Sequence, residues 1–292
     1  MSLCDQRTVI ITGAGGGLGR AYALAFAAEG ARVLVNDIRL EAAQAVVAEV
    51  VVAGGKALAN NGDITTMAGA QSIVDAALAA FGEVHVLVNN AGILRDRMFV
   101  SLSEDDWDQV MRVHLKGHFC LANILGRRWR DAAKAGAKVD ARIINTSSGA
   151  GLQGSIGQSN YSAAKGGIAA LTLVQAAEMA RYGVTANALA PAARTSMTES
   201  AMPEMVKAPQ DGSFDAWAAE NVAPLVVWLG STRSAHVSGK VFESQGGRIS
   251  LGDGWRTDAT RDKGARWEAA ELGPVIDALL AEAVPAQKVW GS

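Results

Sequence analysis

The sequence predicts an α/β fold, with one domain built on a doubly wound parallel sheet and helices on both faces. Short apolar runs alternate along the chain with longer, Ala-rich segments of helical periodicity. The apolar runs have the character of strands buried on both faces, as in a parallel sheet. No Ser-, Pro- or Gly-rich linker divides the chain. Strands that alternate with helices form right-handed βαβ units, which place a layer of helices on each side of the sheet.

The elements are expected in the following order. Strands are predicted at residues 8–12, 32–36, 84–89, 142–146 and 184–189. Helices are predicted at residues 18–29, 40–53, 67–81, 105–133 and 161–181. Ser103 and Asp106 match a variant of the capping box, which marks the start of the fourth helix.

Composition narrows the class of protein. The chain of 292 residues is 49% hydrophobic, enough for one sizeable core, and its formal net charge of −2 gives no reason to bind nucleic acid or an anionic membrane. No apolar run is long enough to span a bilayer, and residues 1–7 do not resemble a signal peptide. Cys4 and Cys120 are the two cysteines, and no His/Cys cluster has metal-binding spacing. We therefore expect a cytoplasmic protein without a metal site.

Two segments bear on domain organisation. We place the main domain at residues 1–255. Within it, residues 196–214 contain methionine and proline, have little periodicity, and are expected to form a lid over a bound substrate. The tail, residues 256–292, carries an apolar stripe, formed by Val275, Ile276, Leu279 and Leu280. The stripe predicts a helix that packs on its own domain or on a partner subunit.

A glycine-rich segment follows the first strand and opens the first helix. Gly13, Gly17 and Gly19 have the spacing G-x-x-x-G-x-G, with Leu18 between the last two. Glycines let the backbone turn tightly and approach a pyrophosphate, and the helix N-terminus offers free N–H groups. The segment therefore predicts a Rossmann-type dinucleotide site. Asp37 ends the second strand, where a carboxylate accepts hydrogen bonds from ribose hydroxyls and repels a 2′-phosphate, so NAD is expected rather than NADP.

Tyr161 and Lys165 are four residues apart, so on a helix they share one face. A fixed cation beside a phenol favours the phenolate and brings the tyrosine pKa toward the range useful for acid–base catalysis. Alone, such a pair fits an ordinary helix face equally well. After a dinucleotide site, it indicates proton transfer to or from an alcohol oxygen.

Taken together, these residues resemble the short-chain dehydrogenase/reductase family. The glycine spacing is that of the family, residues 89–92 match its N-N-A-G element, and residues 187–191 match a stretch that ends in a proline near the nicotinamide. The serine of the family lies thirteen residues before the tyrosine, which is Ser148 here. The resemblance implies that Tyr161 is the general base in oxidation and that Ser148 positions the substrate oxygen. It implies that Lys165 lowers the phenol pKa and holds the nicotinamide ribose.

The resemblance leaves three positions open. Only the residue count favours Ser148 over its neighbour Ser147. The family asparagine that supports a proton relay behind the lysine is replaced by His114, which either continues the relay or is a packed helix histidine. The nicotinamide carboxamide is expected to meet Thr195 or Ser196, with a preference for Thr195.

Further cofactor contacts follow from the same resemblance. They are expected at Asp63, Ile64, Asn89, Ala91, Gly92 and Pro191. Asp63 lies where family members bind the adenine, although Asp63 and Asn89 equally fit a turn and a strand end. The loop at residues 95–97 contributes two arginines, one of which is expected to meet a CoA phosphate.

A narrower resemblance is to the (3R)-hydroxyacyl-CoA dehydrogenase part of type 2 peroxisomal multifunctional enzymes. It rests on residues 90–97, 113–117, 157–165 and 222–229. It implies an NAD-dependent secondary alcohol dehydrogenase with a (3R)-hydroxyacyl-CoA as substrate. The wider family resemblance implies a homodimer or homotetramer joined through the long helices. The alternatives are a dehydrogenase of 17β-hydroxysteroids or other alicyclic alcohols and, in another class, a non-catalytic NAD-binding sensor or scaffold.

Overall fold

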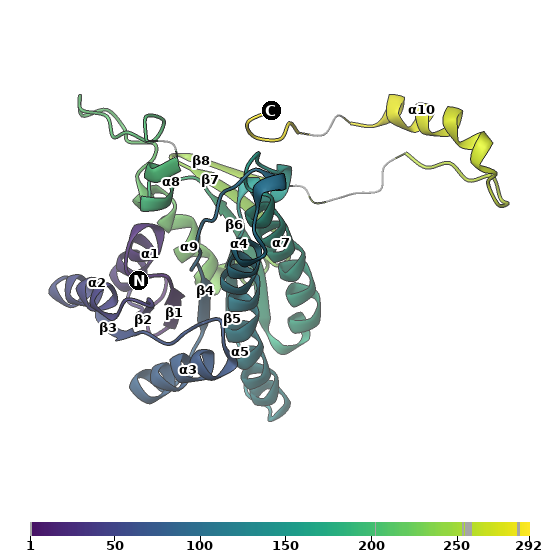
Figure 1. Cartoon of the computed structure of the whole chain (residues 1–292). Coiled ribbons are helices and arrows are strands. Elements are labelled where there is room, and N and C mark those ends of the chain that lie inside the picture. The colour runs from purple at the N-terminus through teal and green to yellow at the C-terminus, as the bar shows by residue number, and fades with distance from the viewer. Residues whose placement is uncertain (1, 202, 253, 255–258, 285–286) are drawn as a thin grey trace.

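Strand order in the single sheet is β3-β2-β1-β4-β5-β6-β7-β8, as Figure 1 shows for the computed structural model. The structure describes residues 2–201, 203–252, 254, 259–284 and 287–292. Neighbours from β3 to β7 are parallel, and β8 runs antiparallel to β7. The strands are β1 (Thr8–Thr12), β2 (Arg32–Asn36), β3 (Lys56–Asn60), β4 (Val86–Asn89), β5 (Ala141–Thr146), β6 (Val184–Pro191), β7 (Val241–Gln245) and β8 (Arg248–Gly252). The predicted doubly wound α/β class is confirmed.

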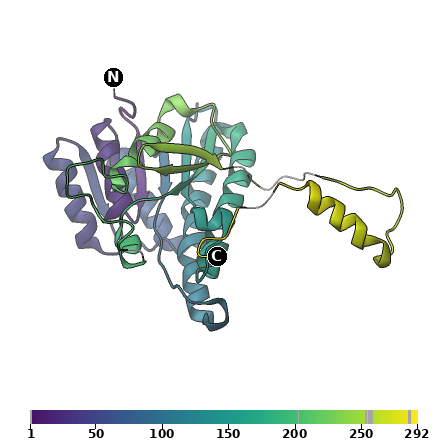
Figure 2. The same ribbon diagram turned by 90° about the horizontal axis from the view of Figure 1, so that it is seen from above.

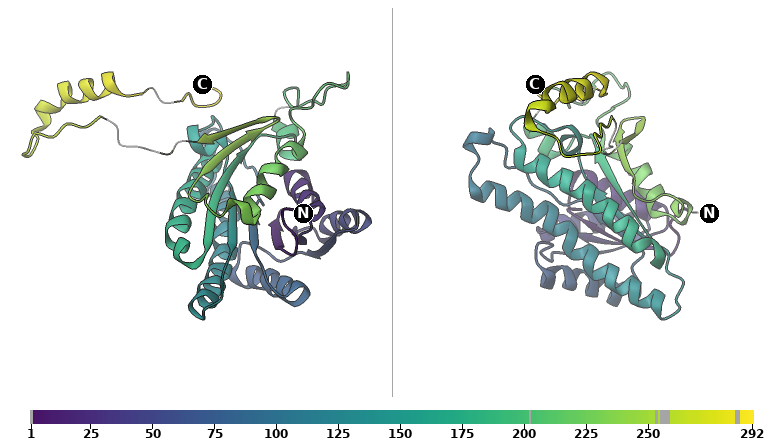
Figure 3. Two further views of the ribbon diagram at one scale, coloured as in Figure 1. Left: turned by 180° about the vertical axis from the view of Figure 1, so that it is seen from behind. Right: turned by 90° about the vertical axis from the view of Figure 1, so that its right-hand side faces the viewer.

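Helices cover both faces of the sheet, which Figure 2 shows from above. One layer consists of α1 (Gly17–Ala28), α2 (Leu40–Val52) and α9 (Ala223–Gly230). The other consists of α3 (Met67–Phe81), α5 (Gly117–Lys134) and α7 (Ser159–Met179), and Figure 3 shows α5 and α7 side by side on the outside of the molecule. Shorter helices are α4 (Glu104–Met111), α6 (Gly149–Gln153), α8 (Ser196–Ala201) and α10 (Leu272–Glu282).

Burial of the central strands on both faces explains their apolar runs. In β1, Val9 and Ile11 pack under the α1 layer, whereas Ile10 packs under the α3 layer, and all three are fully buried. Successive side chains of a strand point to opposite faces, so a strand between two helix layers needs apolar residues at every position. The same alternation recurs in β4 and β5.

The long helix predicted at residues 105–133 is interrupted. Ser103 caps α4 as expected, since its hydroxyl oxygen accepts the Asp106 N–H at 3.1 Å. Between α4 and α5, however, residues Arg112–Lys116 form a π-helical turn that contains His114. A π turn inserts one residue into the helix and changes the direction of its side chains, and such turns are often found at functional sites.

The predicted tail has two parts with different surroundings. Helix α10 stands away from the sheet domain, and none of its residues is buried (Figures 1 and 2). Residues 289–292 lie against the domain instead, where the Ile156 N–H donates to the Trp290 carbonyl at 2.9 Å and the Trp290 N–H donates to the Gly154 carbonyl at 3.2 Å. The predicted boundary at residues 255 and 256 lies outside the described residues.

Candidate active site

The candidate catalytic and cofactor residues lie in segments that follow the carboxyl ends of the parallel strands. The glycine loop follows β1, Asp37 follows β2, residues 90–97 follow β4, Ser148 follows β5 and Thr195 follows β6. In a sheet of this order, β1 and β4 are neighbours although β2 and β3 intervene in the chain. The direction of the crossovers reverses at this point, which is where open α/β sheets bind their ligands.

The glycine loop fits a dinucleotide phosphate. Gly13 and Gly17 have φ of 61° and 51°, a backbone conformation that favours glycine. Helix α1 begins after Gly16 without a side-chain cap, and a Cβ built on Gly16 would meet no atom within 4 Å. Free N–H groups at an open helix N-terminus form an anion site.

Asp37 borders this loop. Its carboxylate accepts the Gly15 N–H at 3.0 Å and the Arg39 N–H at 3.0 Å, and the residue is 8% exposed. The Arg39 side chain lies 3.4 Å from the same carboxylate and is mostly exposed. The carboxylate is therefore fixed beside the phosphate loop, with one cation near it.

Asn90 supports the glycine loop and was not among the predicted site residues. Its side-chain amide donates to the carbonyls of Thr12 at 3.0 Å and Gly13 at 3.2 Å. The Thr12 hydroxyl oxygen accepts the N–H groups of Asn90 and Ala91 at 3.0 and 3.1 Å. A signal was present in the sequence, because Asn90 belongs to the N-N-A-G element.

Ser148, Tyr161 and Lys165 come together in space. Ser148 is the N-cap of α6, and its side chain lies close enough to the Tyr161 phenol to oppose the rise in pKa that burial causes there. The Lys165 Nζ lies 5.5 Å from the centre of the Tyr161 ring and donates to the Thr146 carbonyl at 2.5 Å. Ser147 is turned elsewhere, since its hydroxyl donates to the Lys165 carbonyl at 2.9 Å. The geometry gives Ser148 the position beside the phenol.

Burial shifts the pKa values of Tyr161 and Lys165 in opposite directions. Desolvation raises the pKa of Tyr161 above its usual value, and the Asp96 charge adds to the rise, while the Ser148 hydrogen bond opposes it. Desolvation lowers the pKa of Lys165 to about 7. The expected lowering of the tyrosine pKa by the lysine is not found in the structure, because burial disfavours the charged form of both groups.

His114 is fully buried beside Tyr161. Its ring meets the tyrosine ring edge-on with centroids 5.2 Å apart, and its Nε2 lies 2.7 Å from the Ile93 oxygen and 3.0 Å from the Ile93 nitrogen. Burial and, second, the Lys165 charge lower the pKa of His114 to about 3, so the imidazole is neutral near pH 7. Its Nδ1 atom is buried without a hydrogen-bond partner in the described part of the chain.

The other predicted cofactor residues occupy varied positions. Both carboxylate oxygens of Asp63 bind Thr65, one accepting its N–H at 2.8 Å and the other its hydroxyl at 3.0 Å. Ile64 is buried and packs against Gly117. The Asn89 side chain points into the interior, where its amide donates to the side-chain oxygen Oδ1 of Asn145 at 3.0 Å. These contacts match the turn and strand-end alternatives for Asp63 and Asn89.

Residues after β6 reach back toward the glycine loop. Pro191 is the last residue of β6, and the Thr195 methyl carbon lies 3.2 Å from the place where a Cβ would sit on Gly17. The Thr195 N–H donates to the Thr198 hydroxyl at 2.8 Å, and Ser196 begins α8. Thr195 is therefore adjacent to the glycine loop.

The loop at residues 95–97 is held by the segment that precedes Tyr161. The Asn160 side chain donates to the Arg95 carbonyl at 3.0 Å, and the Gln158 side chain donates to Asp96 at 2.9 Å. The Arg97 N–H donates to the Gly157 carbonyl at 2.9 Å. Both arginine side chains are exposed, so the loop presents two cations near the tyrosine.

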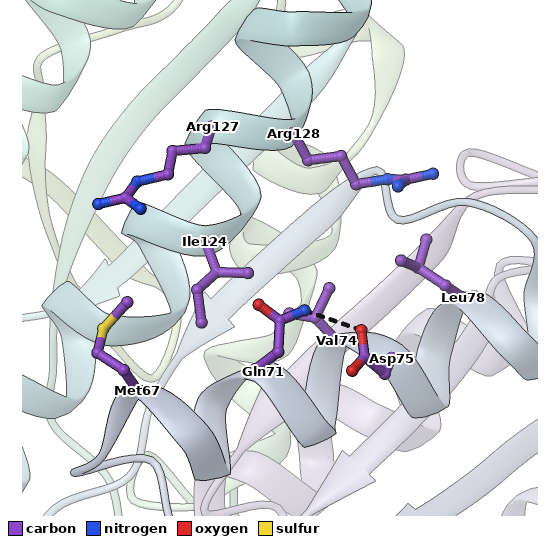
Figure 4. A pocket seen from close by; sticks show the side chains of 8 residues that line it. All are labelled: Met67, Gln71, Val74, Asp75, Leu78, Ile124, Arg127 and Arg128. Carbon is purple, nitrogen blue, oxygen red and sulfur yellow. Dashed lines mark hydrogen bonds between the residues drawn. The ribbon is translucent and has the colours of Figure 1, made fainter.

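Other features of the described chain lie apart from this cluster. A groove of about 330 Å³ between α3 and α5 is lined by apolar side chains together with the hydrogen-bonded pair Gln71 and Asp75, and it is bordered by Arg127 and Arg128 (Figure 4). It contains none of the residues discussed above. Among the described residues, no group of three or more potential ligands is arranged to hold a metal ion, and no helix is both long and apolar enough to cross a membrane.

Comparison with known proteins identifies the family of the chain. Residues 7–206 match the short chain dehydrogenase family. Hydroxyacyl-CoA dehydrogenase ChsB1 of Mycobacterium tuberculosis is 44% identical over 255 residues, which cover 84% of this chain and 79% of that protein. Peroxisomal multifunctional enzyme type 2 of Mus musculus is 43% identical over 281 residues, 93% of this chain and 34% of that protein.

A solved structure gives the same result in three dimensions. The crystal structure of a short chain dehydrogenase from Mycobacterium avium superimposes with a TM-score of 0.91 at 54% sequence identity, covering 99% of this chain and 100% of that one. The family implies a nicotinamide dinucleotide cofactor and oxidation or reduction at a CH–OH carbon. The chain belongs to the short-chain dehydrogenase family.

Proposed function

We propose that this protein is an NAD-dependent dehydrogenase that oxidises the hydroxyl group of (3R)-hydroxyacyl-CoA thioesters. The observation that carries the proposal is the Ser148, Tyr161 and Lys165 cluster beside an open glycine loop. The substrate class is supported by the 44% identity to a hydroxyacyl-CoA dehydrogenase. The exposed arginines at residues 95–97 add to this support, because guanidinium groups bind phosphates well.

The residues divide the chemistry among them. The bound cofactor supplies the hydride acceptor. Tyr161 accepts the proton of the substrate hydroxyl, Ser148 donates a hydrogen bond to the substrate oxygen, and Lys165 stabilises the phenolate. His114, whose ring touches that of Tyr161, is proposed to continue a proton relay behind Lys165 in its neutral form.

Replacement of Tyr161 by Phe tests the base. The rate constant kcat should fall about 100-fold or more, the size of a general-base contribution, while the Kd for NAD stays within about twofold. Burial raises the pKa of Tyr161, and only the phenolate accepts a proton, so kcat/KM of the native enzyme for alcohol oxidation should increase with pH on the alkaline side. Steady-state kinetics and NAD titration measure these effects. Near-native turnover of the variant would disprove the assignment.

The cofactor preference is proposed to depend on Asp37. The 2′-phosphate of NADP would lie against this fixed carboxylate. Two negative charges side by side cost several kcal/mol, which corresponds to a preference for NAD over NADP of about 100-fold or more. Asp37→Ser should therefore increase kcat/KM for NADP relative to NAD. Arg39→Gln, which removes the neighbouring cation, should change the ratio in the other direction. A native enzyme that uses NADP as well as NAD would refute the proposal.

The substrate is tested by comparing acyl-CoAs with steroids. NADH formation should be efficient with (3R)-hydroxyacyl-CoAs of some chain length, and slower with 17β-hydroxysteroids. The double variant Arg95→Gln/Arg97→Gln should raise KM for the acyl-CoA about tenfold, because a lost phosphate contact costs about 1.4 kcal/mol. The KM for a steroid, which has no phosphate, should not change. Arg127→Gln/Arg128→Gln, in the distant α3–α5 groove, is the matched control. Equal effects on both substrates would contradict the CoA role.

The end of the tail is proposed to form one wall of the substrate site. A Cβ on Gly149, the residue after Ser148, would lie 2.5 Å from the Trp290 ring, so the indole covers the backbone beside the catalytic serine. Trp290 is 48% exposed and offers an apolar surface there. Its backbone is bonded to residues 154 and 156, which precede Tyr161.

Trp290→Ala should therefore raise KM for long-chain acyl-CoAs by about tenfold, since burial of part of an aromatic side chain contributes roughly 1–2 kcal/mol. The Kd for NAD should not change. Trp267→Ala is the control, because Trp267 lies in the same tail but stacks under Lys263. Identical kinetics for the two variants would exclude Trp290 from the substrate site.

The remaining predictions concern assembly and the lid. Exposed apolar side chains on α5 and α7, Phe119, Leu173 and Val174, support association of these helices in a homodimer or homotetramer. No apolar residue of α10 is fully buried by the described part of the chain, and these residues are proposed to meet a partner subunit. Residues 196–214 begin directly beside Thr195, which fits a lid; Met202 within them lies outside the described residues. The cytoplasmic location stays a prediction.

A further inference from the structure

A second buried histidine lies behind Lys165, on the first turn of α5. His118 is 1% exposed, and its Nε2 accepts the Thr146 N–H at 3.3 Å. The carbonyl of the same residue, Thr146, accepts the Lys165 Nζ at 2.5 Å. The imidazole and the ammonium are thus connected through the backbone of one residue.

Strand pairing does not supply an alternative partner for Thr146 on this side. The register of β4 with β5 ends at Asn89 opposite Asn145, so Thr146 lies one residue beyond the end of β4. A buried backbone N–H without an acceptor costs about 1–3 kcal/mol. The His118 imidazole supplies the acceptor that a further residue of β4 would otherwise provide. It does so at Thr146, the residue that binds Lys165.

The surroundings keep His118 neutral. Burial is the main cause that moves its pKa well below the usual value, and the charge of Lys165 on α7 adds to this. The other titratable group that faces it is His114 on the π turn, which is neutral near pH 7. The β4 neighbour Asn89 is uncharged, and its side chain donates to the His118 carbonyl at 3.4 Å. A neutral imidazole has one acceptor nitrogen, which is what the Thr146 N–H requires.

We infer that His118 is a positioning residue for Lys165, acting through the Thr146 backbone. By fixing Thr146 it holds the carbonyl that binds the ammonium, and so it supports the charged form of the lysine on which the Tyr161 phenolate depends. The expected effects on kcat and KM rest on the proposed dehydrogenase function. The expected effect on the titration of Lys165 does not depend on any substrate.

Three variants separate positioning from packing. His118→Leu removes the acceptor, and His118→Asn keeps a polar group that is too short to take the place of Nε2. In His118→Gln the side-chain carbonyl reaches the position of Nε2 and should rescue the native behaviour. His85→Leu is the matched control, because the His85 Nδ1 also accepts a backbone N–H, that of Thr8 at 3.1 Å, at the amino end of β1.

The first measurement is the titration of Lys165 by NMR of its side chain in the protein without ligands. The native midpoint should lie at about 7. In His118→Leu and His118→Asn the midpoint should move to lower pH, because an ammonium that loses a fixed carbonyl is less stable. His118→Gln and His85→Leu should keep the native midpoint. An unchanged midpoint in both disrupting variants would overturn the inference, even if no substrate has been found.

The second measurement is the pH dependence of kcat/KM for alcohol oxidation. A less stable ammonium favours the phenolate less, so the activity of His118→Leu and His118→Asn should rise at higher pH than in the native enzyme. At pH 7 kcat should fall about tenfold, the effect of a change of one unit in pKa, with KM within about twofold. If kcat/KM of the disrupting variants falls by the same factor at all pH values, or if His118→Gln does not restore the native pH dependence, His118 contributes to packing and not to the position of Lys165. If His118→Leu does not fold, His118→Asn provides the same test.

Discussion

Asparagine side chains fix the carboxyl ends of the strands relative to one another, and the geometry of the site depends on these contacts. The Asn36 amide donates to Asn60 and so joins β2 to β3, and the Asn89 amide donates to Asn145 and joins β4 to β5. Asn187 bonds the segment before β7 through both its amide nitrogen and its oxygen. The buried donors and acceptors in these contacts all have hydrogen-bond partners, and a buried network of this kind is rigid. A shift of one strand would leave several of these groups without partners.

The same contacts extend from the sheet to α7, the helix that carries the candidate catalytic pair. The Asn145 side chain accepts from Asn89 and donates to Thr172 and Gln175 on α7, at 2.9 and 2.8 Å. Helix α7 carries both Tyr161 and Lys165, so its position relative to β5 determines where the ammonium meets Thr146. The candidate catalytic pair is thus placed by polar groups in the core, whereas its helix is held to the sheet by apolar packing.

Burial explains why the site depends on more than the tyrosine and the lysine. In water each group would be far from the pKa that acid–base catalysis at neutral pH needs, and desolvation moves the tyrosine further away. The Ser148 hydrogen bond opposes that effect directly, and any group that keeps Lys165 charged opposes it indirectly. Close positioning of these neighbours therefore decides the fraction of phenolate.

The parts of the fold that were predicted from sequence are those with strong periodicity. The five central strands and the helices between them were found because burial on both faces requires apolar residues at every position. Strand β3 was missed because it lies at the sheet edge, where its sequence, Lys-Ala-Leu-Ala-Asn, is only partly buried and contains one large apolar residue. Strand β8 is an exposed antiparallel edge, and its partner β7 contains Glu243 and Gln245. The π turn has no periodicity signal, since its residues continue a helical pattern.

At the candidate site, motifs predicted the residues that we propose for the chemistry, but not the residues that hold them in place. Tyr161, Lys165 and the glycines have fixed spacings along the chain. Asn90, Asn160 and His118 act on residues that are distant in sequence, and their partners become visible only when the strands are placed side by side. Spacing along one segment carries no information about contacts between segments.

The exchange of the family asparagine for His114 shows how one such contact constrains another. A Cβ on Gly92 would lie 2.4 Å from the His114 ring, so the imidazole fits only because the last residue of N-N-A-G is glycine. The π turn directs the ring toward Ile93 and Tyr161, and burial keeps it neutral. A charged imidazole there would repel the Lys165 ammonium and oppose its role. A neutral one adds a hydrogen-bonding group beside the tyrosine without competing for the charge on which the phenolate depends.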